Sequence, residues 1–190
     1  MSSSSRQTWK ISTALALSVL FVIFFAGPAP ADRAEEMEAK VKAWAMECRS
    51  EIKTQFEYLV TSGKLTMAQM FDTFYIPIPN TTPQKFRTQY DALCDAVIQG
   101  ILDKYLGKDP ALFFVVAVDR NGYLPTHNSK SRDRSKRVFN DRTGLAAARN
   151  TEPFLLQKYN RDTGETIYDL SVPIHVHNRH WGAVRFGYAP

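Results

Sequence analysis

Residues 165–176 read ETIYDLSVPIHV and show a clear strand pattern. Its apolar side chains fall on every second residue: Tyr168, Leu170, Val172, Ile174 and Val176. Successive side chains of a strand point to opposite faces of a sheet, so the alternation predicts a strand with one buried face. The segment HWGAVRFGY (180–188) alternates in the same way, and Arg185 on its polar side is expected to face solvent.

Two more strands are expected upstream of this pair. The run LFFVVAVD (112–119) is rich in valine and phenylalanine, which favours a buried strand, and TEPFLLQKYN (151–160) is interpreted as another. Short polar connectors join the last three strands, so these three are predicted to form an antiparallel meander. Residues 111–190 are therefore expected to form an antiparallel, PAS-like sheet region.

Residues 32–110 show helical periodicity instead. Steps of three or four separate a first set of apolar positions: Met37, Val41, Trp44, Cys48, Ile52, Phe56 and Leu59. This spacing predicts one long amphipathic helix that ends at Ser62–Gly63. A second, short helix capped by Thr66 is expected to hold Met67, Met70, Phe71 and Phe74.

A third helix is predicted to open at Thr82–Pro83, because proline is favoured in a first helical turn, and to close at Gly107. Its apolar stripe is expected to be Phe86, Tyr90, Leu93, Val97, Ile101 and Tyr105. Helices followed by antiparallel strands indicate the α+β class, here as the two regions of one domain.

Residues 1–31 have the pattern of an export segment. Arg6 and Lys10 precede an apolar run at 11–27, and Ala29-Pro30-Ala31 fits the small-residue cleavage rule. The segment is interpreted either as a signal peptide removed after Ala31 or as an uncleaved N-terminal anchor in the inner membrane. Both readings place the remainder of the chain in the periplasm.

The charge of the exported part limits its partners. The chain has 24 Lys and Arg against 19 Asp and Glu, and two of the basic residues lie in the export segment. The small remaining excess argues against a nucleic-acid partner and is compatible with an anionic small molecule. Cys48 and Cys94 could form a disulfide in an oxidising compartment, or both could be small buried hydrophobes on helical stripes.

Three segments carry a resemblance to a known family: VAVDRNGYLPTHN (116–128), VFNDRTGLAAARNTEPFLLQKYNRDTGE (138–165) and YDLSVPIHVHNRHWGAVRFGY (168–188). They resemble the extracytoplasmic sensor domain of bacterial methyl-accepting chemotaxis receptors, a single Cache-type domain with a PAS-like sheet behind a long N-terminal helix. The similarity covers Phe71 to Tyr188. It implies a periplasmic domain for signal transduction that binds a small organic anion, either a carboxylate or an amino acid, between the sheet and its covering segments.

The sequence departs from that family in two places. Receptors of this type continue into a second membrane helix, a HAMP linker and a signalling coiled coil, whereas this chain ends at Pro190. The expectation is a sensor domain without its own output domain, which acts on a membrane-bound signalling partner or is a receptor relic. The loop at 129–138 is shorter than usual, which predicts a pocket that is more open or lost.

The bend GYLPTHN (122–128) supplies the first candidate ligand contacts. Asn121-Gly122 favours a tight turn, and Pro125 restricts the backbone, so His127 and Asn128 are expected to lie rigidly near a strand end. Such placement suits ligand binding, because little entropy is lost when a ligand arrives. The alternative is that both side chains only bond the loop backbone.

Two arginines and two tyrosines complete the candidate site. Arg142 and Arg149 could each bind a carboxylate with two hydrogen bonds, or could instead pair with Asp141, Glu152 or Asp169. Tyr123 and Tyr168 could wall the pocket and donate a hydroxyl, or could pack in the core. The basic run at 130–137 is interpreted as a solvated loop, with lipid headgroups as the alternative contact.

Enzymatic chemistry is not expected. The sequence has no nucleophile elbow, glycine-rich phosphate loop or paired carboxylates at metal spacing, so no catalytic residues, metal or cofactor are assigned. His175, His177 and His180 could hold a metal, but Pro173 favours the polar face of an edge strand.

A structural role is the competing interpretation. The long helix could pair with a copy of itself and form a homodimer, with or without a small-molecule ligand.

Overall fold

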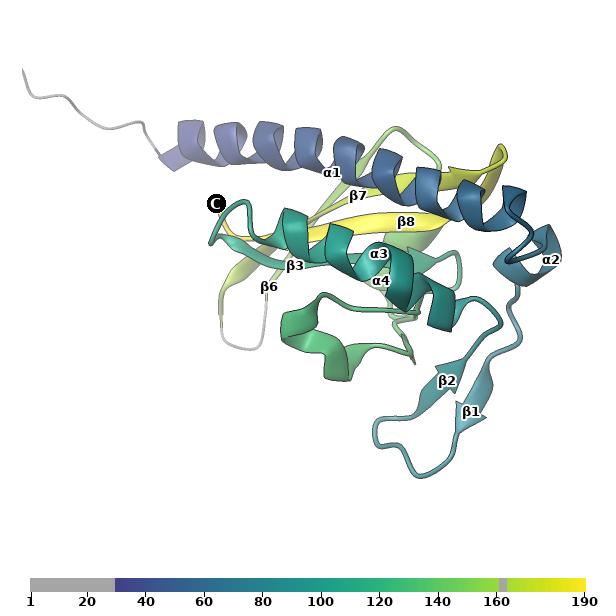
Figure 1. Ribbon diagram of the computed structural model, residues 1–190. Coiled ribbons are helices and arrows are strands. Elements are labelled where there is room, and N and C mark those ends of the chain that lie inside the picture. Colours follow the sequence, from purple (N-terminus) through teal and green to yellow (C-terminus); the bar gives the residue numbers. More distant parts are fainter. Residues whose placement is uncertain (1–29, 161–163) are drawn as a thin grey trace, which may run out of the picture.

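The computed structural model describes residues 30–160 and 164–190. Figure 1 shows one long helix lying along a curved sheet, with shorter helices and a hairpin around it. The apolar part of the predicted export segment lies outside the described residues. Within the described part, no helix is both long and apolar enough to cross a membrane.

The long helix α1 spans Pro30–Thr61. The predicted stripe is confirmed, because its inward face is buried along its length: Met37, Val41, Ala45, Cys48, Ile52, Phe56 and Leu59. Ala45 replaces Trp44 on this face, and Trp44 lies half-buried beside it. Gly63 ends the helix with a φ of 73°, a conformation that glycine adopts without a steric penalty.

The short helix α2 spans Met67–Met70, and Thr66 caps it as predicted. The Thr66 hydroxyl accepts from the Gln69 N–H while the Gln69 side chain accepts from the Thr66 N–H, which is a complete capping box. Phe71 and Phe74 lie beyond the helix end. Phe74 is 75% exposed to solvent.

The predicted start of the third helix was wrong. Two short strands, β1 (Ile76–Ile78) and β2 (Lys85–Arg87), pair antiparallel, and α3 spans Asp91–Leu106. Phe86 pairs with Pro77 in β1, and its N–H donates to the Lys136 carbonyl at 2.7 Å. Its backbone is therefore part of a strand and not of a helix. Assigning Phe86 to the helix also misplaced the stripe, which in the structure is Tyr90, Cys94, Ile98, Leu102 and Tyr105.

The main sheet contains β3 (Leu112–Asp119), β6 (Leu155–Asn160), β7 (Thr166–Val176) and β8 (Arg179–Tyr188). Its order is β3-β8-β7-β6 with antiparallel neighbours, which confirms the meander and the α+β class. β7 lies between β8 and β6, so it is not an edge strand over most of its length. Pairing between β6 and β7 ends at Ser171, however, so Pro173 needs no N–H on that side.

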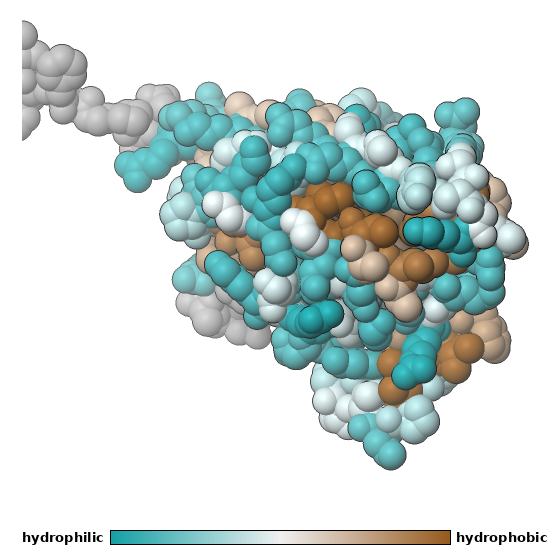
Figure 2. Space-filling view, viewed as in Figure 1, coloured by the Kyte–Doolittle hydropathy of each residue, from teal (hydrophilic) through white to brown (hydrophobic). Residues whose placement is uncertain are grey.

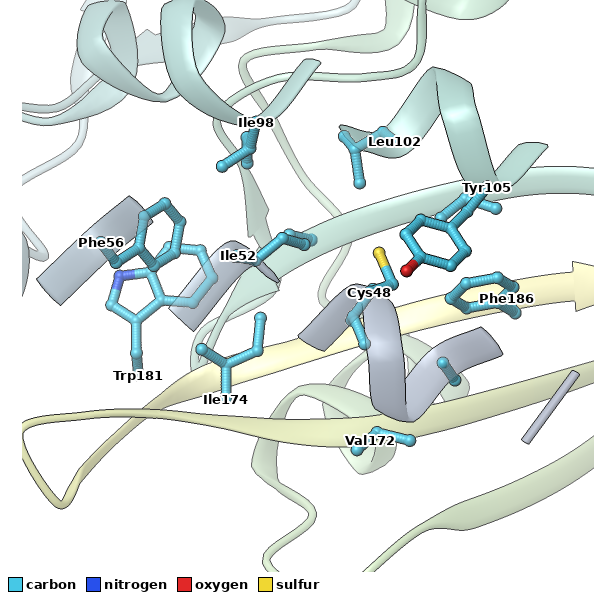
Figure 3. Packing of buried hydrophobic residues seen from close by; sticks show 14 of the residues in the cluster. Cys48, Ile52, Phe56, Ile98, Leu102, Tyr105, Val172, Ile174, Trp181 and Phe186 are labelled. Carbon is cyan, nitrogen blue, oxygen red and sulfur yellow. The ribbon is translucent and has the colours of Figure 1, made fainter. Parts of the chain in front are cut away.

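One face of the sheet forms the main core against α1 and α3. Figure 3 shows Phe56 of α1 against Trp181 of β8, with Ile52 beside them and with Cys48 and Phe186 farther along, next to Tyr105. Both cysteine thiols are free and buried, and burial raises their pKa values. This arrangement agrees with the interpretation of Cys48 and Cys94 as small core hydrophobes.

The opposite face of the sheet has a different cover. It consists of α4 (Arg142–Arg149), the strand pair β4 (Tyr123–Leu124) and β5 (Arg137–Val138), and the 3-10 segment η1 (Ser129–Arg134) between those strands. A smaller apolar cluster on this side contains Val116, Val118, Leu124 and Ala148. The cover is therefore made of loops and short elements, and it leaves space above the sheet.

The buried stripe of α1 packs against the sheet and α3 of its own chain. A homodimer through α1, which stays a prediction, would have to use another face of the helix. Figure 2 shows hydrophobic surface between the two helices. A groove of about 380 Å³ lies there, lined by residues that include Thr54, Gln55, Val97 and Ile101.

Candidate ligand-binding site

A cavity of about 740 Å³ lies on the face of the sheet opposite α1. The β3 side chains Val116 and Val118 form part of its floor, and Leu124 and Phe139 from the cover complete an apolar section. Its polar lining comes from separate elements: His127, Arg134, Asp141, Thr143, Tyr159 and Arg185. Ligand sites in proteins commonly have this volume and this mixture of apolar walls with few polar groups.

The predicted turn after β3 is confirmed and is held by Asp119. The Gly122 N–H donates to the Asp119 carbonyl at 2.9 Å, and the Asp119 carboxylate accepts from the N–H groups of Asn121 and Tyr123, both at 2.9 Å. Gly122 has a φ of 81°, and a Cβ there would lie 2.3 Å from the Phe139 carbonyl oxygen. Only glycine therefore fits this crossing point.

Two tyrosine hydroxyls also donate to Asp119, from Tyr75 at 2.6 Å and from Tyr90 at 2.9 Å. Burial raises the pKa of the Asp119 carboxyl, and the donated hydrogen bonds oppose that shift. These contacts tie the turn to the segment before β1 and to the start of α3. The chain that follows the turn, residues 122–128, is buried throughout.

His127 lies where this buried stretch meets the cavity. It forms a bridge with Val116 of β3, and its carbonyl accepts from the Gln99 side chain at 3.1 Å. The residue is only 4% exposed, and its Nδ1 has no hydrogen-bond partner in the described part of the chain. Burial, and secondly the Arg134 guanidinium, lower the pKa of His127 to about 4.

Unpartnered polar atoms are concentrated at this point. The Thr126 hydroxyl and both polar atoms of the Asn128 side chain are also buried without a partner among the described residues. Buried polar groups in proteins usually have one, and leaving one unsatisfied costs roughly 1–3 kcal/mol. These atoms have almost no accessible surface, so they lie behind the cavity wall and not on it.

Arg185 is buried, so its predicted exposure to solvent was wrong. It is 8% exposed, and its guanidinium bonds the fully buried Asp169 carboxylate through both Nη2 and Nε, the latter at 3.4 Å from Oδ1. Alternation placed Arg185 correctly on the face away from the main core. It could not show that α4 and the loop segments cover that face.

The ion pair sets the electrostatics of the cavity floor. Burial raises the pKa of the Asp169 carboxyl, against the opposite effect of Arg185, and the attraction of Asp169 keeps the pKa of Arg185 raised despite burial. Arg185 lines the cavity and Asp169 does not. The Arg185 guanidinium therefore faces the cavity, and the Asp169 carboxylate outside the cavity lining fixes its orientation.

The cavity rim carries one further cation and one carboxylate. Arg134 is exposed, lies over the Phe139 ring at 5.5 Å, and forms no ion pair with any described residue. Asp141 caps α4 by accepting from the Gly144 N–H at 2.9 Å. Arg134 is thus the positive charge most available to an entering anion.

The six predicted ligand contacts are not all in one place. His127 lines the cavity, and Asn128 is buried next to it. Arg142 and Arg149 are exposed at the two ends of α4, where the Arg149 Nε donates to the Arg120 carbonyl at 3.4 Å. Neither arginine lines the cavity.

The two tyrosines lie on the side of the main core. The Tyr123 hydroxyl donates to the Phe86 carbonyl at 3.0 Å and is 3.3 Å from an Asp91 carboxylate oxygen. Tyr168 packs against the ring of Tyr188 and lies below Lys158. Their contact with a ligand stays a prediction.

Sequence reasoning missed Arg134 and Arg185. Arg134 was assigned to a solvated basic loop, and its exposure agrees with that interpretation, but the loop folds over the cavity. For Arg185 a signal existed: aspartate is rare inside strands, and Asp169 and Arg185 share the polar face of neighbouring strands. An opposite-charge pair there could have been predicted.

The histidines of β7 and β8 do not form a metal centre within the described residues. No group of three or more His, Cys, Asp or Glu side chains there is placed to hold a metal ion. His175 and His180 lie with ring centroids 5.3 Å apart. His177 occupies the turn, and its N–H donates to Glu57 of α1 at 3.0 Å.

Comparisons with known proteins give a remote likeness. No protein-family model matches the chain, and no curated protein matches its sequence. Among solved structures, an extracellular ligand binding receptor from Desulfohalobium retbaense DSM5692 is similar with a TM-score of 0.40 and 15% identity. The match covers 77% of this chain and 24% of the receptor chain, so the chain spans about a quarter of that receptor. A likeness this remote is no evidence of a shared activity.

Proposed function

We propose that the chain is a non-enzymatic, extracytoplasmic sensor domain that binds a small organic anion in the cavity between its sheet and α4. The observation that carries the proposal is the polar lining of that cavity. His127 and Arg134 line it, and the Arg185 guanidinium, which also lines it, is held in place by Asp169. A site that is ordered before its ligand arrives loses little entropy on binding.

An anion is the ligand that these charges favour. The charge of Arg185 is balanced by Asp169, and the Asp141 carboxylate accepts from the start of α4, whereas Arg134 has no ion-pair partner among the described residues and can contact an anion at the rim. A guanidinium matches the two oxygens of a carboxylate. His127 would then act as a neutral hydrogen-bonding group, because its pKa is lowered.

The signalling role rests on the family resemblance. We infer a chemotaxis-type sensor in the periplasm, exported through residues 1–31 and acting on a membrane-bound partner. Catalysis is disfavoured by the geometry of Ser171 and Asp169, the serine and carboxylate that lie two residues apart on β7. The Ser171 hydroxyl donates to the Leu155 carbonyl at 3.4 Å, while Asp169 is held by Arg185, so they do not form a nucleophile and base pair.

The anion site is tested with two arginine variants of the full chain. Arg134→Gln removes the rim charge from an exposed position, so the fold should be unaffected, and the affinity for a binding carboxylate should fall about tenfold or more. Arg149→Gln, also exposed but outside the cavity, is the matched control and should bind normally. A thermal-shift screen of small carboxylates finds the ligand, and calorimetric titration measures the affinity. Equal loss in both variants, or loss in Arg149→Gln alone, would contradict the assignment.

The lowered pKa of His127 predicts a specific pH dependence of stability. Between about pH 4 and pH 6.5 the folded state binds fewer protons at this residue than the unfolded state, so its contribution to stability falls as the pH falls. Asp119 and Asp169 have raised pKa values and contribute the opposite slope, which a comparison with His127→Gln cancels.

Urea unfolding of both proteins at several pH values measures this effect. The free energy of unfolding of wild type, relative to His127→Gln, should decrease from pH 6.5 to about pH 4 and then level off. A difference that is constant with pH would show that His127 titrates normally.

A further inference from the structure

The lining of the cavity includes two consecutive aromatic side chains, Phe113 and Phe114. Neighbouring residues of a regular strand point to opposite faces, so a regular β3 would present only one of them. The pairing of β3 with β8 is irregular here: Leu112 pairs with Tyr188, Phe114 pairs with Gly187, and Phe113 is the extra residue of a bulge. A bulge of this kind redirects a side chain, and both rings line the cavity as a result.

Gly187 provides the space for one of these rings. A Cβ at this position would lie 2.1 Å from Cε1 and 2.4 Å from Cζ of Phe114, so the ring lies directly on the backbone of β8. The Arg185 guanidinium is 5.9 Å from the centroid of the same ring. The Phe114 ring and the guanidinium therefore lie side by side on the cavity floor.

The second ring is exposed despite its apolar character. Phe113 is 41% exposed, one of four large hydrophobic side chains in the described chain with this degree of exposure. It is the one among them that lines the cavity. A ligand that covered Phe113 would remove apolar surface from water, which stabilises the complex.

Resting on the proposed anion site, we propose that the ligand is an aromatic carboxylate, with its carboxylate at Arg134 and Arg185 and its ring on the platform of Phe113 and Phe114. The apolar section formed by Val116, Val118 and Phe139 continues the platform inward. Offset or edge-to-face contacts between rings add to the gain from burial. A small aliphatic acid would pair with the two arginines but would leave the rings of Phe113 and Phe114 exposed to water.

The test uses matched probes with the full chain, measured by calorimetric titration. Phenylacetate carries both groups, acetate lacks the ring, and phenylacetamide lacks the charge. Phenylacetate should bind at least about tenfold tighter than acetate, from burial of the ring, and also tighter than phenylacetamide. Acetate binding as tightly as phenylacetate would overturn the aromatic assignment while leaving the anion site intact. Phenylacetamide binding equally well would show that the charge is not recognised, and absence of binding by all three would reject both.

Two variants test whether the phenyl ring of phenylacetate binds at Phe113 and Phe114. Phe113→Ala should weaken phenylacetate about fivefold or more and leave acetate unchanged, because it removes apolar contact area without touching the cations. Phe74→Ala is the matched control, since Phe74 is an exposed phenylalanine outside the cavity. Gly187→Ala adds a second measurement, because its methyl group displaces the Phe114 ring. Unchanged phenylacetate affinity in both platform variants would overturn the proposal.

Discussion

Replacing Asp169 with alanine should destabilise the domain by about 3–5 kcal/mol, because it leaves the Arg185 guanidinium buried without a counter-charge. Asp169 has no exposed surface, and Arg185 bonds its carboxylate through two nitrogens. The Arg185 side chain is only 10% exposed, so water in the cavity can replace little of the lost carboxylate. Urea unfolding followed by circular dichroism would measure the loss as a lower midpoint.

A second variant separates the cost of an orphaned charge from the value of the pair. Asp169→Leu combined with Arg185→Met removes both charges and should recover much of the stability, because a well-packed apolar pair often equals a buried ion pair. The same double variant should lose anion binding, since Arg185 lines the cavity. A loss below about 1 kcal/mol for Asp169→Ala would mean that Arg185 reaches water, and the pre-ordered cavity floor would be incorrect.

Trp181→Ala should cost a similar amount, about 3–5 kcal/mol, through a different mechanism. Trp181 is buried, with its ring centroid 4.8 Å from that of Phe56 and 6.0 Å from that of Tyr90. Its indole N–H donates to the Met70 carbonyl at 3.1 Å. Removing the ring leaves a cavity where α1, α3 and β8 meet, as Figure 3 shows for Phe56 and Trp181. The Met70 carbonyl would also lose its indole donor.

Two control variants show whether the loss of stability comes from the position of Trp181 in the core. Trp181→Phe keeps most of the apolar volume and loses the indole hydrogen bond, so it should cost about half as much. Trp44→Ala removes the same side chain from a half-buried place on α1 and should cost less than Trp181→Ala. Equal costs for the two alanine variants would show that the junction of α1 with β8 is not the centre of the core.

The strands and the long helix could be predicted from sequence because their signal is local. Alternation at 165–176 and 180–188 identified β7 and β8, and the stripe from Met37 to Leu59 identified α1. The start of α3 failed because one apolar residue, Phe86, fits a helical stripe and a short strand equally well. Its partners, Pro77 and the Lys136 carbonyl, are distant in sequence.

The cavity was harder to predict than the fold. His127 could be found because the turn and Pro125 that position it are adjacent in the chain. Arg185 required knowledge of what covers the polar face, and Phe113 required a bulge, which depends on the register between β3 and β8. The periodicity of a single segment predicts neither the cover of the polar face nor the bulge.

An NMR titration of the full chain with phenylacetate would show where a carboxylate binds, because backbone amide shifts locate a ligand without disturbing the protein. The shifts should concentrate around His127, Phe139 and Arg185, on the face of the sheet opposite α1. They should be small along α1, including Thr54 and Gln55 in the groove beside α3. Saturable shifts centred on that groove, or no saturable shifts with any carboxylate, would contradict the assignment of the cavity as the ligand site.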